Sequence, residues 1–146
     1  MNGVIIVARA TADCGKTTAI RSTLFYLKMR NAVVISEQEF NNQGPHKPGD
    51  VKAVIEYQGI KIGISSMGDP GTNQTEILDE FIKNGCRIII CACRIWGGTK
   101  DPIDALKDRW EIRYIHTASY GFISLDTMWN ELMQAIRMIK FACVDN

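Results

Sequence analysis

The chain has 146 residues, of which 46% are hydrophobic and 23% are charged, and its formal net charge is +1. This length and composition are typical of one globular domain, so we expect a single domain over residues 1–146. The near-zero net charge argues against the broad basic surface of a nucleic-acid-binding protein. No apolar stretch approaches the ~20 residues that span a bilayer, and no basic segment precedes the first apolar run. We therefore expect a cytoplasmic protein without a membrane span or signal peptide.

The five cysteines agree with this compartment. Their number is odd, and no pair has the C-x-x-C spacing of a zinc site. One cysteine lies inside a glycine-lysine motif described below. We expect the other four to be small buried apolar residues: Cys86, Cys91, Cys93 and Cys143.

The first half of the chain alternates apolar runs with one helical pattern. The run "GVIIV" is continuous, as in a strand buried on both faces, and Ile20, Leu24 and Leu27 recur at helical spacing. The predicted elements are a strand over 3–7, a helix over 17–30, a buried strand over 32–36, a long loop over 37–50, and a hairpin with arms 51–57 and 60–65.

The second half continues the alternation. The predicted elements are a glycine-rich turn over 66–73, a helix over 72–84, a buried strand over 87–93, a short helix at Asp101, a strand over 111–116 and a C-terminal helix from Ser124 or Asp126. Strands that alternate with helices imply a mostly parallel sheet with helices on both faces. We predict a three-layer α/β/α fold whose hairpin forms one antiparallel edge.

Residues 10–17, "ATADCGKT", join the first strand to the first helix. A loop of this length can wrap its backbone N–H groups around a phosphate, while the helix directs its positive end at the same place. Gly15 permits a close approach to the phosphate. Lys16 would reach the β- and γ-phosphates, and the Thr17 hydroxyl would be a ligand of Mg²⁺.

This segment resembles the Walker A motif of the P-loop NTPases, with Ala10 where the general pattern has glycine. The resemblance is close over the motif and looser over the order of strands and helices. It implies that the chain binds ATP or another nucleoside triphosphate together with Mg²⁺. The residues that it assigns to nucleotide binding are Ala12, Asp13, Cys14, Gly15, Lys16, Thr17 and Thr18.

The acidic partner of the motif is less regular. P-loop NTPases usually place an Asp at the end of another core strand, where it holds the Mg²⁺ water shell. Here Ser65 occupies that position, within "SSMGDPG". The candidates that remain are Asp69, in the glycine-rich turn and assigned to metal binding and catalysis, and Glu37, assigned to catalysis. Glu37 is expected just past the second strand, at the same carboxyl edge of the sheet, as a base or as a group behind the metal's ligands. Gly68 is a candidate sensor of the γ-phosphate through its N–H group.

The sequence offers one cationic candidate and little evidence on the base. Arg94 follows the strongest predicted strand and could stabilise charge on a transferring phosphoryl group. The Asn-Lys-x-Asp motif of GTPases is missing after the last strand, so ATP is the expected nucleotide and GTP stays open. Tyr120 or Phe122 could stack on an adenine or pack in the interior.

Three functions fit these features. The first is a small ATPase or kinase-like phosphotransferase, in which the loop over 37–50 would cover a small acceptor. The second is a nucleotide-dependent switch that a partner protein recognises, with slow or no turnover. The third is a nucleotide-binding scaffold without catalysis.

Overall fold

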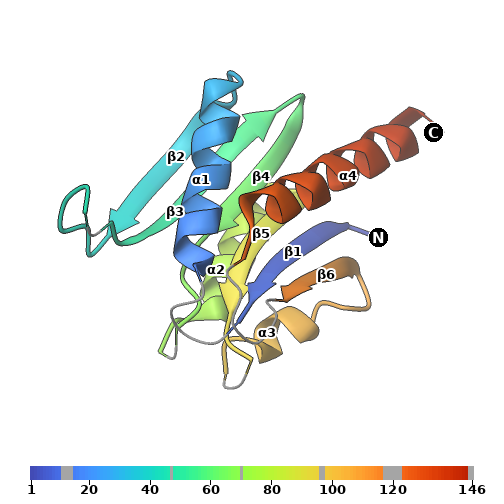
Figure 1. Ribbon diagram of the computed structural model, residues 1–146. Coiled ribbons are helices and arrows are strands. Elements are labelled where there is room, and N and C mark those ends of the chain that lie inside the picture. The colour runs from blue at the N-terminus through green and yellow to red at the C-terminus, as the bar shows by residue number, and fades with distance from the viewer. Residues whose placement is uncertain (11–14, 47, 70, 96–97, 117–122, 145–146) are drawn as a thin grey trace.

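The computed structural model describes residues 1–10, 15–46, 48–69, 71–95, 98–116 and 123–144 (Figure 1). These residues form six strands and four helices in a mixed α/β arrangement. In chain order the elements are β1 (Gly3–Arg9), α1 (Lys16–Met29), β2 (Val33–Phe40), β3 (Asp50–Tyr57), β4 (Ile60–Ser65), α2 (Gln74–Lys83), β5 (Ile88–Cys93), α3 (Asp101–Asp104), β6 (Trp110–His116) and α4 (Leu125–Val144).

One sheet holds all six strands in the order β2-β3-β4-β5-β1-β6. The pairs β4–β5, β5–β1 and β1–β6 are parallel, whereas β3 is antiparallel to both β2 and β4. All strands except β3 therefore run in one direction. As a result, the first residue of β3 lies at the edge of the sheet where the parallel strands end.

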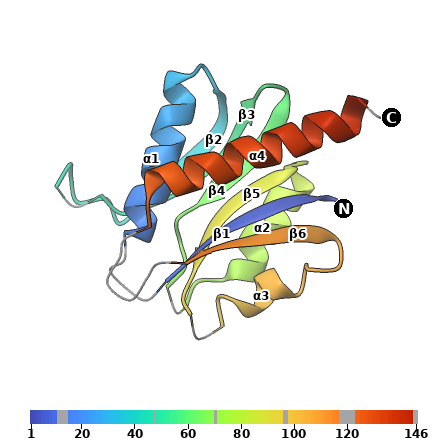
Figure 2. The same ribbon diagram turned by 45° about the vertical axis from the view of Figure 1, so that its right-hand side comes forward.

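The helices lie on both faces of the sheet (Figure 2). One buried apolar cluster joins α1 and α4 to the sheet, with Ile20, Leu27 and Leu132 in it. A second cluster joins α2 to the opposite face through Leu78 and Phe81, together with Ile103 of α3. β5 and most of β1 are buried between these clusters because both of their faces are covered. No helix among the described residues is long and apolar enough to cross a membrane.

Most predicted elements are confirmed. The two hairpin arms are β3 and β4, and they meet at Gln58 and Gly59, both of which have positive φ. The C-terminal helix begins after Ser124, whose hydroxyl accepts hydrogen bonds from the first backbone N–H groups. Cys86, Cys91 and Cys93 are buried free thiols as expected. The side chain of Cys143 lies outside the described residues.

The prediction of β2 is wrong in two respects. The strand continues to Phe40, so Glu37 lies within it and the loop covers only residues 41–49. The strand is also exposed along nearly its whole length, because it is the outer strand of the sheet. The predicted antiparallel edge is corrected for the same reason: the hairpin of β3 and β4 lies inside the sheet, with β2 beyond it.

Candidate functional site

Lys16 lies at the carboxyl ends of β1 and β5. Its ammonium nitrogen is 3.1 Å from the carbonyl oxygen of Ala10 and 3.5 Å from that of Cys93, the residues at which the two strands end or have just ended. The residue is only 7% exposed. A cation held at this position is suited to contact an anion above the strand ends.

The beginning of α1 is built around Gly15 and Lys16. Gly15 has a φ of 75°, a left-handed conformation that glycine adopts without a steric penalty. Lys16 is the first helical residue, so the orphan N–H groups of the first turn and the positive end of the helix lie beside its side chain. Thr18 is exposed on the next part of the turn. Ala12, Asp13 and Cys14 lie outside the described residues.

The same place is a topological switch point. The chain leaves β1 through α1, which packs on one face of the sheet, and leaves β5 through α3, which packs on the other. Ligands of open α/β sheets bind in the crevice outside the strand ends where the connections diverge in this way. The position of Lys16 between β1 and β5 therefore agrees with the general location of such binding sites.

Thr17 faces a carboxylate that the sequence did not single out. Its hydroxyl is 3.4 Å from Oδ1 of Asp50, the first residue of β3. The hydroxyl of Ser66 donates to the same oxygen at 2.9 Å and accepts a hydrogen bond from the backbone N–H of Val51. Two hydroxyl groups and one carboxylate thus converge beside the first turn of α1.

Asp69 and Arg94 form an ion pair at the same edge. Nη2 and Nε of Arg94 are 3.1 Å and 3.3 Å from Oδ1 of Asp69. The hydroxyl of Thr99 donates to the carbonyl of Gly68 and lies 3.4 Å from the backbone nitrogen of Arg94. Buried Gln74 donates in turn to the carbonyl of Thr99. These bonds connect the turn after β4 with the loop after β5.

Ser65 and Gly68 lie at the end of β4 and in the turn that follows it. Ser65 is the last residue of β4 and is fully buried, and its hydroxyl accepts from the backbone N–H of Met67. Gly68 packs directly on β5: a Cβ there would stand 2.7 Å from the backbone of Ala92. β4 therefore ends on a serine whose hydroxyl is hydrogen-bonded to the neighbouring backbone.

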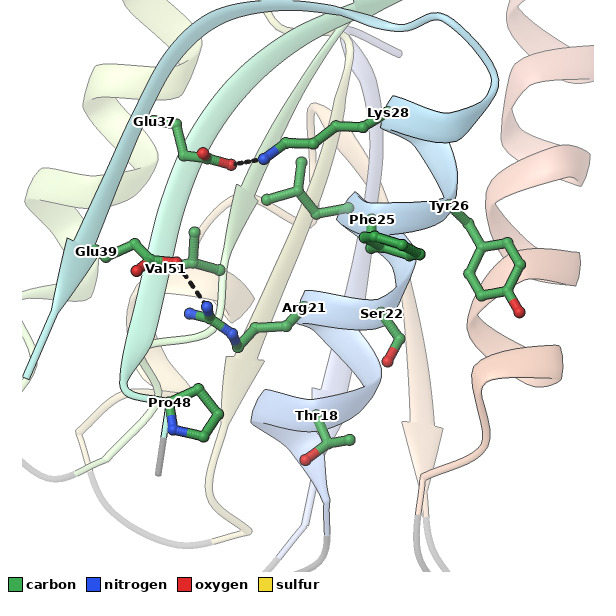
Figure 3. A pocket seen from close by; sticks show the side chains of 11 residues that line it. Thr18, Arg21, Ser22, Phe25, Tyr26, Lys28, Glu37, Glu39, Pro48 and Val51 are labelled. Atoms are coloured by element: carbon green, nitrogen blue, oxygen red, sulfur yellow. Dashed lines mark hydrogen bonds and ion pairs between the residues drawn. The ribbon is translucent and has the colours of Figure 1, made fainter. Parts of the chain in front are cut away.

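Glu37 does not lie at the carboxyl edge. It sits within β2, paired in register with Ala53, and forms an ion pair with Lys28 near the far end of α1. Figure 3 shows the pair at one end of a groove of about 370 Å³ between α1 and β2, with Thr18 and Pro48 at the other end. The expectation that Glu37 follows the strand is wrong, and its carboxylate is directed to the helix.

Behind Lys16, the opposite face of the sheet holds a mixed cluster of charged and aromatic side chains. The guanidinium of Arg9 lies 5.4 Å from the centre of the Tyr114 ring. The hydroxyl of Tyr114 donates to Asp104, which also pairs with Lys100. Burial raises the pKa of the nearby Cys93 thiol to about 11. That thiol therefore stays protonated at neutral pH and is a poor nucleophile.

The structure brings Lys16, Thr17, Asp69 and Arg94 to one edge of the sheet and leaves Glu37 away from it. Asp50 was missed because it was assigned to the end of a loop. The predicted hairpin could have located Asp50. The first residue of a strand lies at the same edge of the sheet as the last residues of the antiparallel strands beside it. Tyr120 and Phe122 lie outside the described residues.

Comparison of the chain with protein-family models, curated proteins and solved structures finds no match.

Proposed function

We propose that this chain has a P-loop NTPase fold and binds ATP, or another nucleoside triphosphate, with Mg²⁺. The observation that carries the proposal is the buried Lys16 ammonium at the ends of β1 and β5, at the beginning of α1. A lysine in this position can contact the β- and γ-phosphate oxygens while the first N–H groups of the helix receive the remaining negative charge. The segment 10–17 would provide the surrounding loop.

The proposed reaction is hydrolysis, or transfer of the γ-phosphoryl group to a small acceptor. Catalysis of this kind depends on positioning and on stabilising charge that spreads over the phosphoryl oxygens. Lys16 and the Arg94 guanidinium are two cations that would do this at the site. Asp69, 3.1 Å from Nη2 of Arg94, would orient that guanidinium. Thr17 would hold Mg²⁺, which supplies charge neutralisation at the β- and γ-oxygens.

A nucleotide-dependent switch is the second candidate, and one set of contacts favours it. The loop over 41–49 ends against α1, because Arg21 donates to the carbonyl of Gly49 and Thr17 reaches Asp50. A ligand at Thr17 would therefore change contacts that hold this loop. A single-turnover assay separates the two functions: labelled phosphate on an added hydroxylated acceptor supports a kinase, free phosphate supports an ATPase, and tight binding with negligible release supports a switch.

Nucleotide binding itself is tested with Lys16→Ala. Loss of a charged hydrogen-bond donor should weaken the affinity for ATP by about 10–100-fold. Lys28→Ala is the matched control, because Lys28 lies on the same helix and pairs with Glu37 away from the site. Isothermal titration calorimetry with both variants measures the effect. Equal affinity of Lys16→Ala and the wild type, or no binding of ATP or GTP by the wild type, would refute the proposal.

A further inference from the structure

Three acidic side chains were considered for the role that a strand-end Asp fills in P-loop NTPases, and two of them are paired with protein cations. Asp69 pairs with Arg94, and Glu37 pairs with Lys28. Asp50 takes part in none of the ion pairs found within the described ranges. Of the three, its carboxylate is the one without an ion-pair partner among the described residues.

Asp50 is also fixed in place from several sides. Ser66 donates to its Oδ1 at 2.9 Å and is itself bound to the backbone of Val51 through two hydrogen bonds. On the other side, Nη1 of Arg21 holds the carbonyl of Gly49 at 3.0 Å. These bonds tie the carboxylate to the residue that follows β4, and they tie the backbone just before it to α1.

The ligand set beside Thr17 matches the chemistry of Mg²⁺. This ion prefers oxygen ligands and is commonly held by one or two carboxylates together with substrate phosphates. The hydroxyl of Thr17 and the carboxylate of Asp50 supply such oxygens, 3.4 Å apart. The described part of the chain contains no group of three or more His, Cys, Asp or Glu side chains that could hold a metal.

We propose that Asp50 is the carboxylate of the Mg²⁺ site. It would take the role of the Asp that P-loop NTPases have at the end of a core strand, where this chain has Ser65 at the end of β4. The substitution is possible because β3 is antiparallel, which brings its first residue to the edge where β4 ends. The inference rests on the proposed nucleotide binding. It assigns the metal to Thr17 and Asp50, and it leaves Asp69 to orient Arg94.

The test measures how Mg²⁺ changes the affinity for a fluorescent, non-hydrolysable ATP analogue, titrated once in EDTA and once in MgCl₂. In the wild type, Mg²⁺ should tighten binding. In Asp50→Asn this gain should fall by about 10–100-fold. Binding of Asp50→Asn in EDTA should be unchanged or tighter, because a carboxylate near phosphates repels them when no metal lies between. A purely structural role would weaken binding in both conditions and would overturn the inference.

Glu37→Gln is the matched control, because Glu37 pairs with Lys28 away from the strand ends, and it should keep the full gain from Mg²⁺. Retention of the gain in Asp50→Asn, or an equal loss in Glu37→Gln, would overturn the inference and leave nucleotide binding intact. A wild type that binds equally well in EDTA and MgCl₂ would also overturn the inference without refuting nucleotide binding. A wild type that binds in neither condition would refute the proposed function as well. Circular dichroism checks that each variant is folded. If Asp50→Asn unfolds, the gain from Mg²⁺ is measured instead in Asp50→Ser, which keeps an oxygen at the start of β3.

Discussion

At the scale of single residues, Gly68 determines how closely the turn after β4 approaches β5. A Cβ at this position would meet the backbone carbon and oxygen of Ala92 at 2.7 Å, and backbone cannot rotate away as a flexible side chain can. Gly68→Ala should therefore displace the turn that carries Asp69 and lower the free energy of unfolding by about 1–3 kcal/mol. Urea denaturation measures the change.

Gly98→Ala is the control for this prediction, because a Cβ on Gly98 meets nothing within 4 Å. Its free energy of unfolding should stay close to that of the wild type. Equal stability of Gly68→Ala and Gly98→Ala would show that the turn accommodates a side chain by a small shift, and that the close approach to Ala92 is not required.

The residues of the site differ in how far the sequence could predict them. The spacing of Gly15, Lys16 and Thr17 is set within one loop, so a local pattern places them correctly at the beginning of α1. Asp50 reaches Thr17 only because β3 pairs with β4 and returns toward α1. Its position follows from strand pairing and direction rather than from its neighbours in the sequence, and a local pattern does not contain that information.

At the scale of elements, the start of α2 depends on Asn73. The side-chain oxygen of Asn73 accepts a hydrogen bond at 3.2 Å from the backbone N–H of Glu76, which would otherwise lack a helical partner. Asn73→Ala should lower the free energy of unfolding by about 1 kcal/mol. Thermal denaturation followed by circular dichroism measures this, with exposed Thr75→Ala in the same turn as the control. A loss in Thr75→Ala as large as that in Asn73→Ala would contradict a capping role.

The sequence predicted the existence of the strands better than their surroundings. The run "AVVIS" has the composition of a buried strand, yet Val33, Val34 and Ile35 are each more than 40% exposed. An apolar run contains no information on its place in the sheet, which depends on the order of all six strands. β5, with an equally apolar sequence, is buried because it lies between β4 and β1.

At the scale of the whole molecule, the candidate site and the main apolar contacts are separated. Lys16, Thr17, Asp50 and Arg94 gather at the edge where the parallel strands end, whereas the two apolar clusters cover the faces of the sheet behind them. Such a separation allows the loops to change without loss of the core. It also implies that stability and ligand binding should respond to different substitutions.

Phe81 on α2 tests this separation. The side chain is fully buried, and its ring lies so close to β4 that only a glycine fits beneath it: a Cβ on Gly63 would stand 2.4 Å from the ring. Phe81→Ala leaves a cavity that the glycine cannot fill, so the free energy of unfolding should fall by about 3–5 kcal/mol. Phe25→Ala removes a ring that is 59% exposed on α1 and should have little effect. Urea denaturation of both variants gives the comparison.

The second measurement on Phe81→Ala is its affinity for ATP at a temperature where the variant is still folded. Phe81 packs on the face of the sheet opposite to α1, so no contact of Lys16 or Thr17 is removed with its ring. The affinity of the folded variant should therefore equal that of the wild type, even though its stability is much lower. A parallel loss of stability and affinity would mean that α2 and the strand ends respond as one unit, and the bonds that join Gln74, Thr99 and Gly68 would be the path for that coupling.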